Sequence, residues 1–190
     1  ETSEGLSADS DPLAAEHNQP WPGGRTNHYL FDMNRDWFIQ TQPETIGRTS
    51  AMLEFYPVAY VDAHEMGSDG TYFFAPEAVP YNPHLAQDQR NSLQLFGRNN
   101  AKYFDMFGFD YFTREVYDAF YPGYGASWPS YFGSIAMTYE QASSSGLVIE
   151  QYDGNELHYR YAVRNHFVTS LATAETVSLN REKFLTDFYN

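Results

Sequence analysis

The most informative segment of the chain reads Gly24-Arg25-Thr26-Asn27-His28-Tyr29-Leu30-Phe31-Asp32-Met33-Asn34-Arg35-Asp36-Trp37. It combines two arginines, two asparagines and two aspartates with large apolar residues over a short distance. The adjacent Asn34 and Arg35 suit a substrate carboxylate, because a planar guanidinium donates two parallel hydrogen bonds to a carboxylate. Arg25 suits a different task, that of polarising a carbonyl and holding the oxyanion that develops on it. Taken alone, arginines near glycine turns more often make structural hydrogen bonds, so these roles depend on the rest of the chain.

Composition limits the classes of fold and partner. At 190 residues, the chain fits one domain with a sizeable core, and we expect residues 1–190 to form a single domain. The net charge of −14 argues against nucleic acid and anionic membranes as partners, since both bind basic faces. The sequence has no cysteine, which excludes disulfides and Cys-ligated zinc, and no apolar run approaches the roughly 20 residues of a membrane span. Aromatic residues make up 18% of the chain, which suits either a tyrosine-rich core or an aromatic lining for a ligand.

The first predicted elements lie on either side of this segment. Residues 1–24 are small, acidic or rich in proline and glycine, which predicts a loop. Thr41-Gln42-Pro43-Glu44 has the pattern of a capping box with proline in the first turn, so we expect a helix over residues 43–56. Residues 58–62 follow at once and predict a strand, because they are β-branched or aromatic. The side chains expected on the buried stripe of the helix are Ile46, Leu53 and Tyr56.

The rest of the chain alternates loops, helices and one further strand. This succession of helix and strand indicates an α/β architecture. The run Tyr72-Phe73-Phe74 is expected to pack in the core rather than to line a pocket. The expected elements are a loop over 67–83, a helix from Asn82-Pro83 to about 107, an aromatic loop over 121–125, a strand over 134–140, a helix over about 156–173 and a last short helix that holds Leu185 and Phe188.

Two of the expected strands end in side chains that can carry chemistry. His64 follows the strand over 58–62, and ligands bind past the carboxyl ends of strands in open α/β sheets. An imidazole there can bind a metal, whereas the neighbouring Glu65 points to the other face of an extended chain. Glu140 ends the strand over 134–140, where a carboxylate can act as general base on a metal-bound water. By itself, each of these two residues would more often be structural or solvated.

The order of these residues resembles that of the zinc carboxypeptidases, the M14 metallopeptidase family. The segment from Arg25 to Arg35 is similar to the Gly-Arg-x-Asn … Asp-x-Asn-Arg block of that family. A helix opened by Gln42-Pro43-Glu44-Thr45, a strand ending in Asp62-Ala63-His64, a tyrosine-bearing loop and then Thr138-Tyr139-Glu140 follow in the family's order. The likeness covers about residues 15–175. It implies an α/β fold with a mixed, twisted sheet and helices on both faces.

The resemblance implies a role for each matched residue. His64 would be the last of three zinc ligands, and Arg25 would stabilise the oxyanion of the tetrahedral intermediate. Asn34 and Arg35 would hold the terminal carboxylate of the substrate. Glu140 would activate the zinc-bound water and later protonate the leaving amine.

Two features of the family are matched less directly. The mobile tyrosine that closes over the substrate would lie in the aromatic loop, with Tyr121 as the first choice and Tyr124 as the second. The spacing from either residue to Glu140 is shorter than in the pancreatic-type enzymes. The family takes its first two zinc ligands from a His-x-x-Glu pair upstream of the Asn-Arg pair, and no histidine of this sequence has Glu or Asp three residues later. The histidines are His17, His28, His64, His84, His158 and His166.

The missing ligand pair leaves two interpretations of the chain. A catalytic zinc normally has three protein ligands, so His64 alone cannot hold it tightly. The chain is therefore expected to be either the C-terminal portion of a carboxypeptidase-like catalytic domain or a degenerate, non-catalytic relative. The start at Glu1 and the loop-like first residues favour the fragment. Its sheet would be incomplete at the N-terminus, and the exposed edges would pair with the missing N-terminal segment or another chain.

The expected function is that of a zinc-dependent metallocarboxypeptidase that cleaves a peptide or amide bond next to a free C-terminal carboxylate, inactive as this fragment alone. Its cofactor would be Zn²⁺, and its partner a peptide or acylated amino-acid substrate. The alternatives are a zinc N-acyl-amino-acid amidohydrolase of the same fold and a non-catalytic relative that binds carboxylates or peptides. An aromatic-lined carbohydrate-binding module explains none of the ordered polar residues. The resemblance and the acidic, Cys-free composition suggest a secreted or periplasmic setting.

Overall fold

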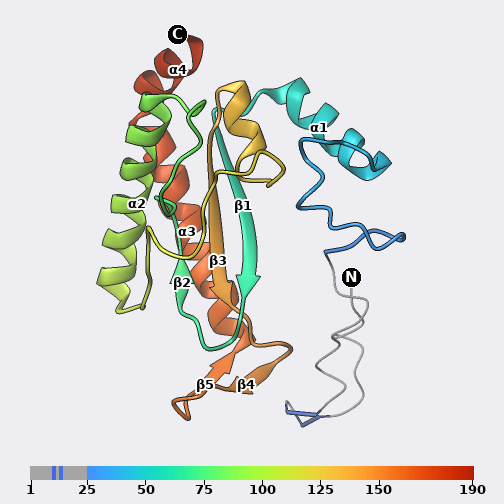
Figure 1. Ribbon diagram of the computed structural model, residues 1–190. Helices are drawn as coiled ribbons and strands as arrows, with labels where there is room; N and C mark the ends of the chain where they lie inside the picture. The colour runs from blue at the N-terminus through green and yellow to red at the C-terminus, as the bar shows by residue number, and fades with distance from the viewer. Residues whose placement is uncertain (1–9, 12, 15–24) are drawn as a thin grey trace.

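A mixed β-sheet forms the centre of the molecule (Figure 1). The computed structural model describes residues 10–11, 13–14 and 25–190, so the loop expected over 1–24 lies almost wholly outside the described residues. β3 pairs in parallel with β1 and antiparallel with β2, in the order β1-β3-β2. A two-stranded hairpin of β4 and β5 follows the end of β3. The strands are β1 (Ala59–Met66), β2 (Tyr72–Phe73), β3 (Ile135–Ala142), β4 (Val148–Glu150) and β5 (Glu156–His158).

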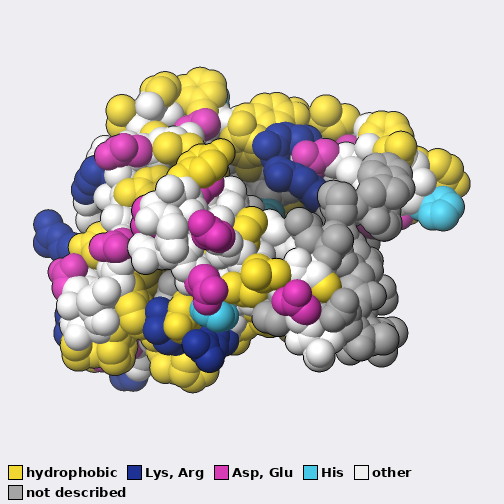
Figure 2. All heavy atoms as spheres, turned by 90° about the horizontal axis from the view of Figure 1, so that it is seen from below, with side chains coloured by type: hydrophobic (Ala, Val, Ile, Leu, Met, Phe, Trp, Pro, Cys, Tyr) yellow, Lys and Arg dark blue, Asp and Glu magenta, His cyan; other side chains and the backbone are white. Residues whose placement is uncertain are grey.

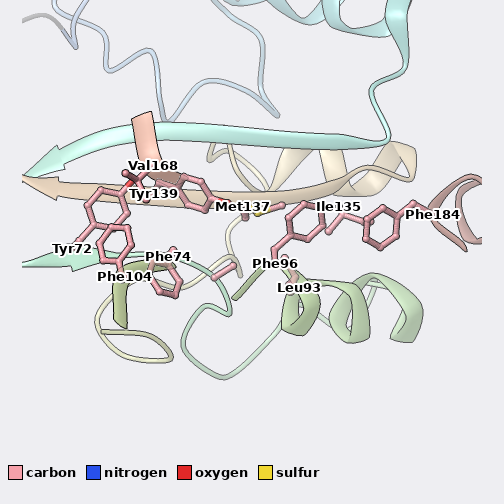
Figure 3. Packing of buried hydrophobic residues seen from close by; sticks show 11 residues of the cluster. Tyr72, Phe74, Leu93, Phe96, Phe104, Ile135, Met137, Tyr139, Val168 and Phe184 are labelled. Atoms are coloured by element: carbon pink, nitrogen blue, oxygen red, sulfur yellow. Dashed lines mark hydrogen bonds between the residues drawn. The ribbon is translucent and has the colours of Figure 1, made fainter. Parts of the chain in front are cut away.

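The main hydrophobic core lies on one face of this sheet. α2 (Gln87–Phe107) and α3 (Tyr159–Leu179) pack against each other and against β3, and α4 (Arg181–Tyr189) packs against both helices. Side chains alternate along a strand, so Ile135, Met137 and Tyr139 of β3 all enter this core (Figure 3). The buried cluster of this core comprises Tyr72, Phe74, Ala75, Leu93, Phe96, Phe104, Ile135, Met137, Tyr139, Val168 and Phe184.

Among the described residues, no helix is both long and apolar enough to cross a bilayer.

The opposite face of the sheet is covered at one end by α1 (Pro43–Phe55) and the short helix η3 (Trp128–Phe132). Trp37, Met52 and Trp128 form a second buried cluster there, and Tyr60 of β1 packs against it. Helices therefore lie on both faces of a mixed sheet, which confirms the expected fold class. Asp62 and His64 share the face of Tyr60 and lie further along β1, beyond this apolar cover.

α1 forms where it was expected but buries a different stripe of side chains. Thr45, Thr49 and Met52 are buried, whereas Ile46 and Tyr56 are each 48% exposed. The prediction that Ile46 and Tyr56 are buried was wrong. A threonine can occupy the buried side of a helix because its hydroxyl bonds to its own backbone, and Thr49 Oγ1 donates to the Thr45 carbonyl at 3.0 Å.

The N-terminus of α1 is held by an aspartate outside the predicted capping box. The N-cap residue is Gln42, and its side chain makes no capping hydrogen bond. Asp36 instead accepts hydrogen bonds from the backbone N–H groups of Thr41 and Gln42, both at 3.0 Å, and from the Thr41 hydroxyl at 2.7 Å. Burial alone would raise the pKa of Asp36, but these bonds outweigh it and hold the pKa below its usual range. The residues after Arg35 are thereby tied to the start of α1.

α2 and α3 begin later than the sequence pattern predicts. α2 starts at Gln87, because the Asn82 side chain accepts the N–H of His84 at 3.0 Å and bends the chain into a turn. The side chain of Gln89 then reaches back to accept the N–H of the N-cap residue, Ala86, at 2.9 Å. α3 starts three residues after the expected position, since β5 takes residues 156–158.

Candidate functional site

A cavity of about 250 Å³ lies on the face of the sheet opposite the main core. Figure 2 views the molecule from the end toward which β1 and β3 point, and in it a group of Lys or Arg side chains borders a hollow in the surface. The lining comes from residues 25–35, from β1 and β3, and from the loop between α2 and η3. The lining residues are Arg25, Asn34, Arg35, Asp62, His64, Val116, Tyr117, Asp118, Tyr124, Thr138 and Glu140.

Strand pairing places four polar side chains of the cavity side by side. In the parallel register of β1 and β3, His64 lies opposite Glu140 and Asp62 lies opposite Thr138. Residues two apart on a strand share a face, so all four side chains line the same cavity. β1 continues to Met66, so His64 lies inside the strand and not after its end, as the sequence had suggested.

His64 is oriented by hydrogen bonding through one ring nitrogen. Its Nε2 lies 2.8 Å from Asp62 Oδ2 and 2.7 Å from Asn34 Nδ2. The hydrogen bond with Asp62 raises the pKa of His64, and this outweighs the opposite effect of burial. Nε2 either donates to Asp62 or accepts from Asn34. In the tautomer that donates to Asp62, Nδ1 keeps a free lone pair and Asn34 Nδ2 donates to Asp62 Oδ2 instead. A carboxylate behind an imidazole is a common way to orient a metal-binding histidine.

Glu140 is a buried carboxyl group that can exchange a proton near neutral pH. It is 8% exposed. Burial raises its pKa to about 6, although the nearby charges of His64 and Arg25 lower it. A carboxyl group with a pKa in this range can accept a proton and later return it, which is the behaviour of a general base and acid.

The amide of Asn34 joins the sheet to the aromatic loop. Its Oδ1 accepts the backbone N–H of Gly125 at 2.6 Å, and its Nδ2 donates to Asp62 Oδ2 at 3.1 Å. A Cβ atom at position 125 would lie 2.4 Å from Asp62 Oδ2 and 2.8 Å from Asn34 Oδ1, so the close approach requires glycine. Asn34 therefore holds the wall of the cavity together.

The two arginines expected at the site both line the cavity. The Arg35 guanidinium lies 4.6 Å from the centre of the Tyr124 ring, and its Nη1 donates to the Asn34 carbonyl at 3.0 Å. Arg25 Nε donates to Asp32 Oδ1 at 3.1 Å, and the Arg25 side chain is 51% exposed. Within the described part of the chain, Arg35 forms no ion pair. Arg35 therefore keeps donors for an anionic ligand.

The structure separates the two tyrosines that the sequence proposed. Tyr124 lines the cavity beside Arg35. Tyr121 is not among the lining residues: its hydroxyl donates to the Arg35 carbonyl at 3.3 Å, and its ring packs edge-on against Tyr124 at 5.2 Å. Tyr121 thus supports the residues that face the cavity from outside it.

Several lining residues were missed by the sequence analysis. Asp62 had a signal, because a residue two positions before His64 on a strand shares its face. Thr138 had the same relation to Glu140. No sequence pattern indicated the consecutive residues Val116-Tyr117-Asp118, since only the path of the loop brings them to the cavity.

The described residues do not form a complete metal site. Among residues 10–11, 13–14 and 25–190, no group of three or more His, Cys, Asp or Glu side chains is arranged to hold a metal ion. Glu65, the residue after His64, accepts a hydrogen bond at Oε2 from Ser143 Oγ at 2.9 Å and is not among the residues that line the cavity. Since a catalytic zinc ion normally has three protein ligands, the described residues do not by themselves fit one.

Comparison of the whole structure with solved structures defines the class of fold. The chain is similar to a metallo-carboxypeptidase from Burkholderia cenocepacia, with a TM-score of 0.62 and 16% identity over 82% of this chain and 40% of that one. It is also similar to a Burkholderia mallei protein assigned as a carboxypeptidase, with a TM-score of 0.61 and 17% identity over 82% of this chain and 41% of that one. No family model and no curated protein sequence matches the chain. The protein therefore has the metallo-carboxypeptidase fold, and it spans about two fifths of the length of these two chains.

Proposed function

We propose that this chain is the C-terminal portion of a zinc-dependent metallocarboxypeptidase-like domain, which cleaves a peptide or amide bond next to a free C-terminal carboxylate. The observation that supports it is the convergence of Arg25, Arg35, His64 and Glu140 on one cavity from separate parts of the chain. Their order along the sequence is the one expected for this class of hydrolase. The fold shared with two carboxypeptidase structures supports the same proposal.

Each residue takes a role that its surroundings allow. Arg35 binds the terminal carboxylate, because its guanidinium has no carboxylate partner in the described chain and its position is set by Tyr124. Asn34 holds the cavity wall next to Arg35 in place through its hydrogen bonds with Asp62 and Gly125. Arg25 polarises the carbonyl to be attacked. Glu140, with its pKa of about 6, removes a proton from the attacking water and delivers it to the leaving amine.

The metal is the part of the proposal that this chain does not supply. His64 would contribute one ligand through Nδ1, and the other ligands would come from a segment or chain outside the described residues. Zinc content of the full-length protein tests this. About one zinc per chain, lost on His64→Ala, is the expected result, and a metal-free full-length protein would leave a carboxylate-binding relative as the better account.

Ligand binding tests the carboxylate site without requiring catalysis. Benzoylglycyl-phenylalanine and its C-terminal amide are titrated against the protein by calorimetry. The free acid should bind at least about tenfold more tightly, since a bidentate charge-assisted pair contributes more than about 1.4 kcal/mol. Arg35→Ala should abolish this difference, and the matched control Arg98→Ala, an exposed arginine elsewhere, should not. Equal affinity for acid and amide in the unaltered protein would refute the proposed carboxylate site.

The size of the cavity keeps an N-acyl-amino-acid amidohydrolase as the second candidate. A space of about 250 Å³ holds a single residue with a small acyl group more readily than a long peptide. A neighbouring cavity of about 630 Å³ shares Arg25, Asn34, Asp62 and His64 and offers room for further peptide residues. Comparing N-acetyl-phenylalanine with longer peptides of the same C-terminus separates the two candidates, because tighter binding of the longer ligands favours the peptidase.

A further inference from the structure

One wall of the cavity is built by the consecutive residues Val116-Tyr117-Asp118. The backbone of this wall is anchored, since the N–H of Ala78 donates to the Tyr117 carbonyl at 2.8 Å and Ala78 pairs with Asp118 in an isolated parallel bridge. The Tyr117 ring packs against Phe73, with centroids 5.0 Å apart. The wall is therefore a fixed surface rather than a loose loop.

The wall presents apolar groups and one acid to the same space. Val116 has φ of 64°, which is rare for a β-branched residue; the residue is 76% exposed and lines the cavity. Tyr117 adds an aromatic surface beside it. Asp118 follows, half-buried, with Oδ1 held by the N–H of Phe120 at 2.8 Å.

The three acids that line the cavity differ in their partners. Asp62 is bonded to His64 and Asn34, and Glu140 lies beside His64 in the sheet. Among the described residues, neither Glu140 nor Asp118 has a basic partner within 4.0 Å, but Glu140 is only 8% exposed, whereas Asp118 is half-buried. Asp118 is therefore the more accessible of the two unpaired acids to a cationic group of a ligand.

We infer that the cavity selects ligands whose C-terminal residue is basic, and that Asp118 is the residue that determines this preference. The inference rests on the proposed function, in which Arg35 holds the terminal carboxylate. The side chains of lysine and arginine combine an aliphatic stem with a terminal cation. The stem would lie against Val116 and Tyr117, and the cation would meet Asp118. Charges of opposite sign on Arg35 and Asp118 also fix the orientation of the ligand.

Three ligands that differ only in the last side chain test this inference. They are benzoylglycyl-lysine, benzoylglycyl-norleucine and benzoylglycyl-glutamate, titrated against the 190-residue chain and its Asp118→Asn variant by calorimetry. Norleucine keeps the aliphatic stem of lysine and lacks its charge. The lysine ligand should bind about tenfold more tightly than the norleucine ligand, and the glutamate ligand should bind most weakly because Asp118 repels it. Asp118→Asn should bring the three affinities close together.

The control variants separate the possible outcomes. Asp110→Asn removes the same charge from an exposed position outside the cavity and should leave the order of affinities unchanged. Circular dichroism and thermal melting establish that each variant is folded. Equal affinity for the three ligands, with all binding lost in Arg35→Ala, would overturn the preference and leave the proposed function standing. A lysine preference that survives Asp118→Asn would also overturn the role of Asp118, and failure of all three ligands to bind would overturn both proposals.

Discussion

Glu77 is a buried carboxyl group whose ionisation should control the stability of the fold. It is 1% exposed, and only one of its oxygens is paired: Oε1 accepts the N–H of Thr138 at 3.2 Å, whereas Oε2 has no partner. Burial raises its pKa from 4.5 to about 7, although the hydrogen bond from Thr138 lowers it. The carboxyl group is therefore neutral in the folded protein at mildly acidic pH.

The sign of the effect is opposite to that of most carboxylates. A raised folded-state pKa means that the folded protein binds the proton more tightly than the unfolded chain does. The stabilisation is complete below the unfolded-state pKa of 4.5 and is lost as the pH rises through the folded-state value of about 7. A difference of about 2.5 pKa units corresponds to roughly 3 kcal/mol of unfolding free energy.

Urea unfolding of the unaltered protein and Glu77→Gln between pH 4.5 and pH 8 measures this contribution. Glutamine keeps an acceptor for Thr138 and does not titrate. The unaltered protein should lose roughly 3 kcal/mol more than Glu77→Gln over this interval, while Asp110→Asn should follow the unaltered protein. Parallel stability curves for the unaltered protein and Glu77→Gln would refute the assignment of a buried, neutral Glu77.

Three further substitutions test the packing around the site and the core by urea unfolding. Gly125→Ala should cost roughly 1–3 kcal/mol and weaken ligand binding, because its Cβ has no room; unchanged binding would contradict the close approach. Arg48→Lys should lower the free energy of unfolding by about 1 kcal/mol, since the guanidinium lies 3.8 Å from the Trp37 ring centre and lysine cannot reproduce a planar stack. If Arg48→Met loses as much stability as Arg48→Lys, the planar stack is supported; if Arg48→Lys loses none, the stack is excluded. Phe96→Ala should lower the free energy of unfolding by roughly 3–5 kcal/mol because Phe96 lies in the core, whereas Phe167→Ala should lower it by less than about 1 kcal/mol because Phe167 is 62% exposed. Similar losses for the two substitutions would contradict the described core.

The secondary structure was largely accessible from local patterns. The β-branched and aromatic residues at 58–62 and 134–140 predict strands, and both strands form there. The helix over 43–56 is also present. Its buried side was predicted wrongly, because periodicity identifies a helix but only the packing partner decides which stripe is buried. Thr45 and Thr49 face inward since Trp37, Met52 and Trp128 gather on that side.

The cap of α1 shows the same limit on a smaller scale. Thr41-Gln42-Pro43-Glu44 has the local pattern of a capping box, yet the N–H groups of Thr41 and Gln42, just before α1, bond to Asp36. Asp36 can do this only because the preceding chain turns back toward the helix. A local pattern cannot contain that turn.

The sequence by itself predicted several residues that could carry chemistry, and their order along the chain, but it missed Asp62 and Asp118. Arg25, Arg35, His64 and Glu140 were predicted from the chemistry of their side chains together with the resemblance of their order to that of a known family. Only the tertiary structure decided which of these side chains meet. The parallel register of β1 and β3 sets His64 beside Glu140, and the path of the loop before η3 brings Asp118 to the same cavity. Register and loop path depend on contacts between residues far apart in sequence, so no local pattern encodes them.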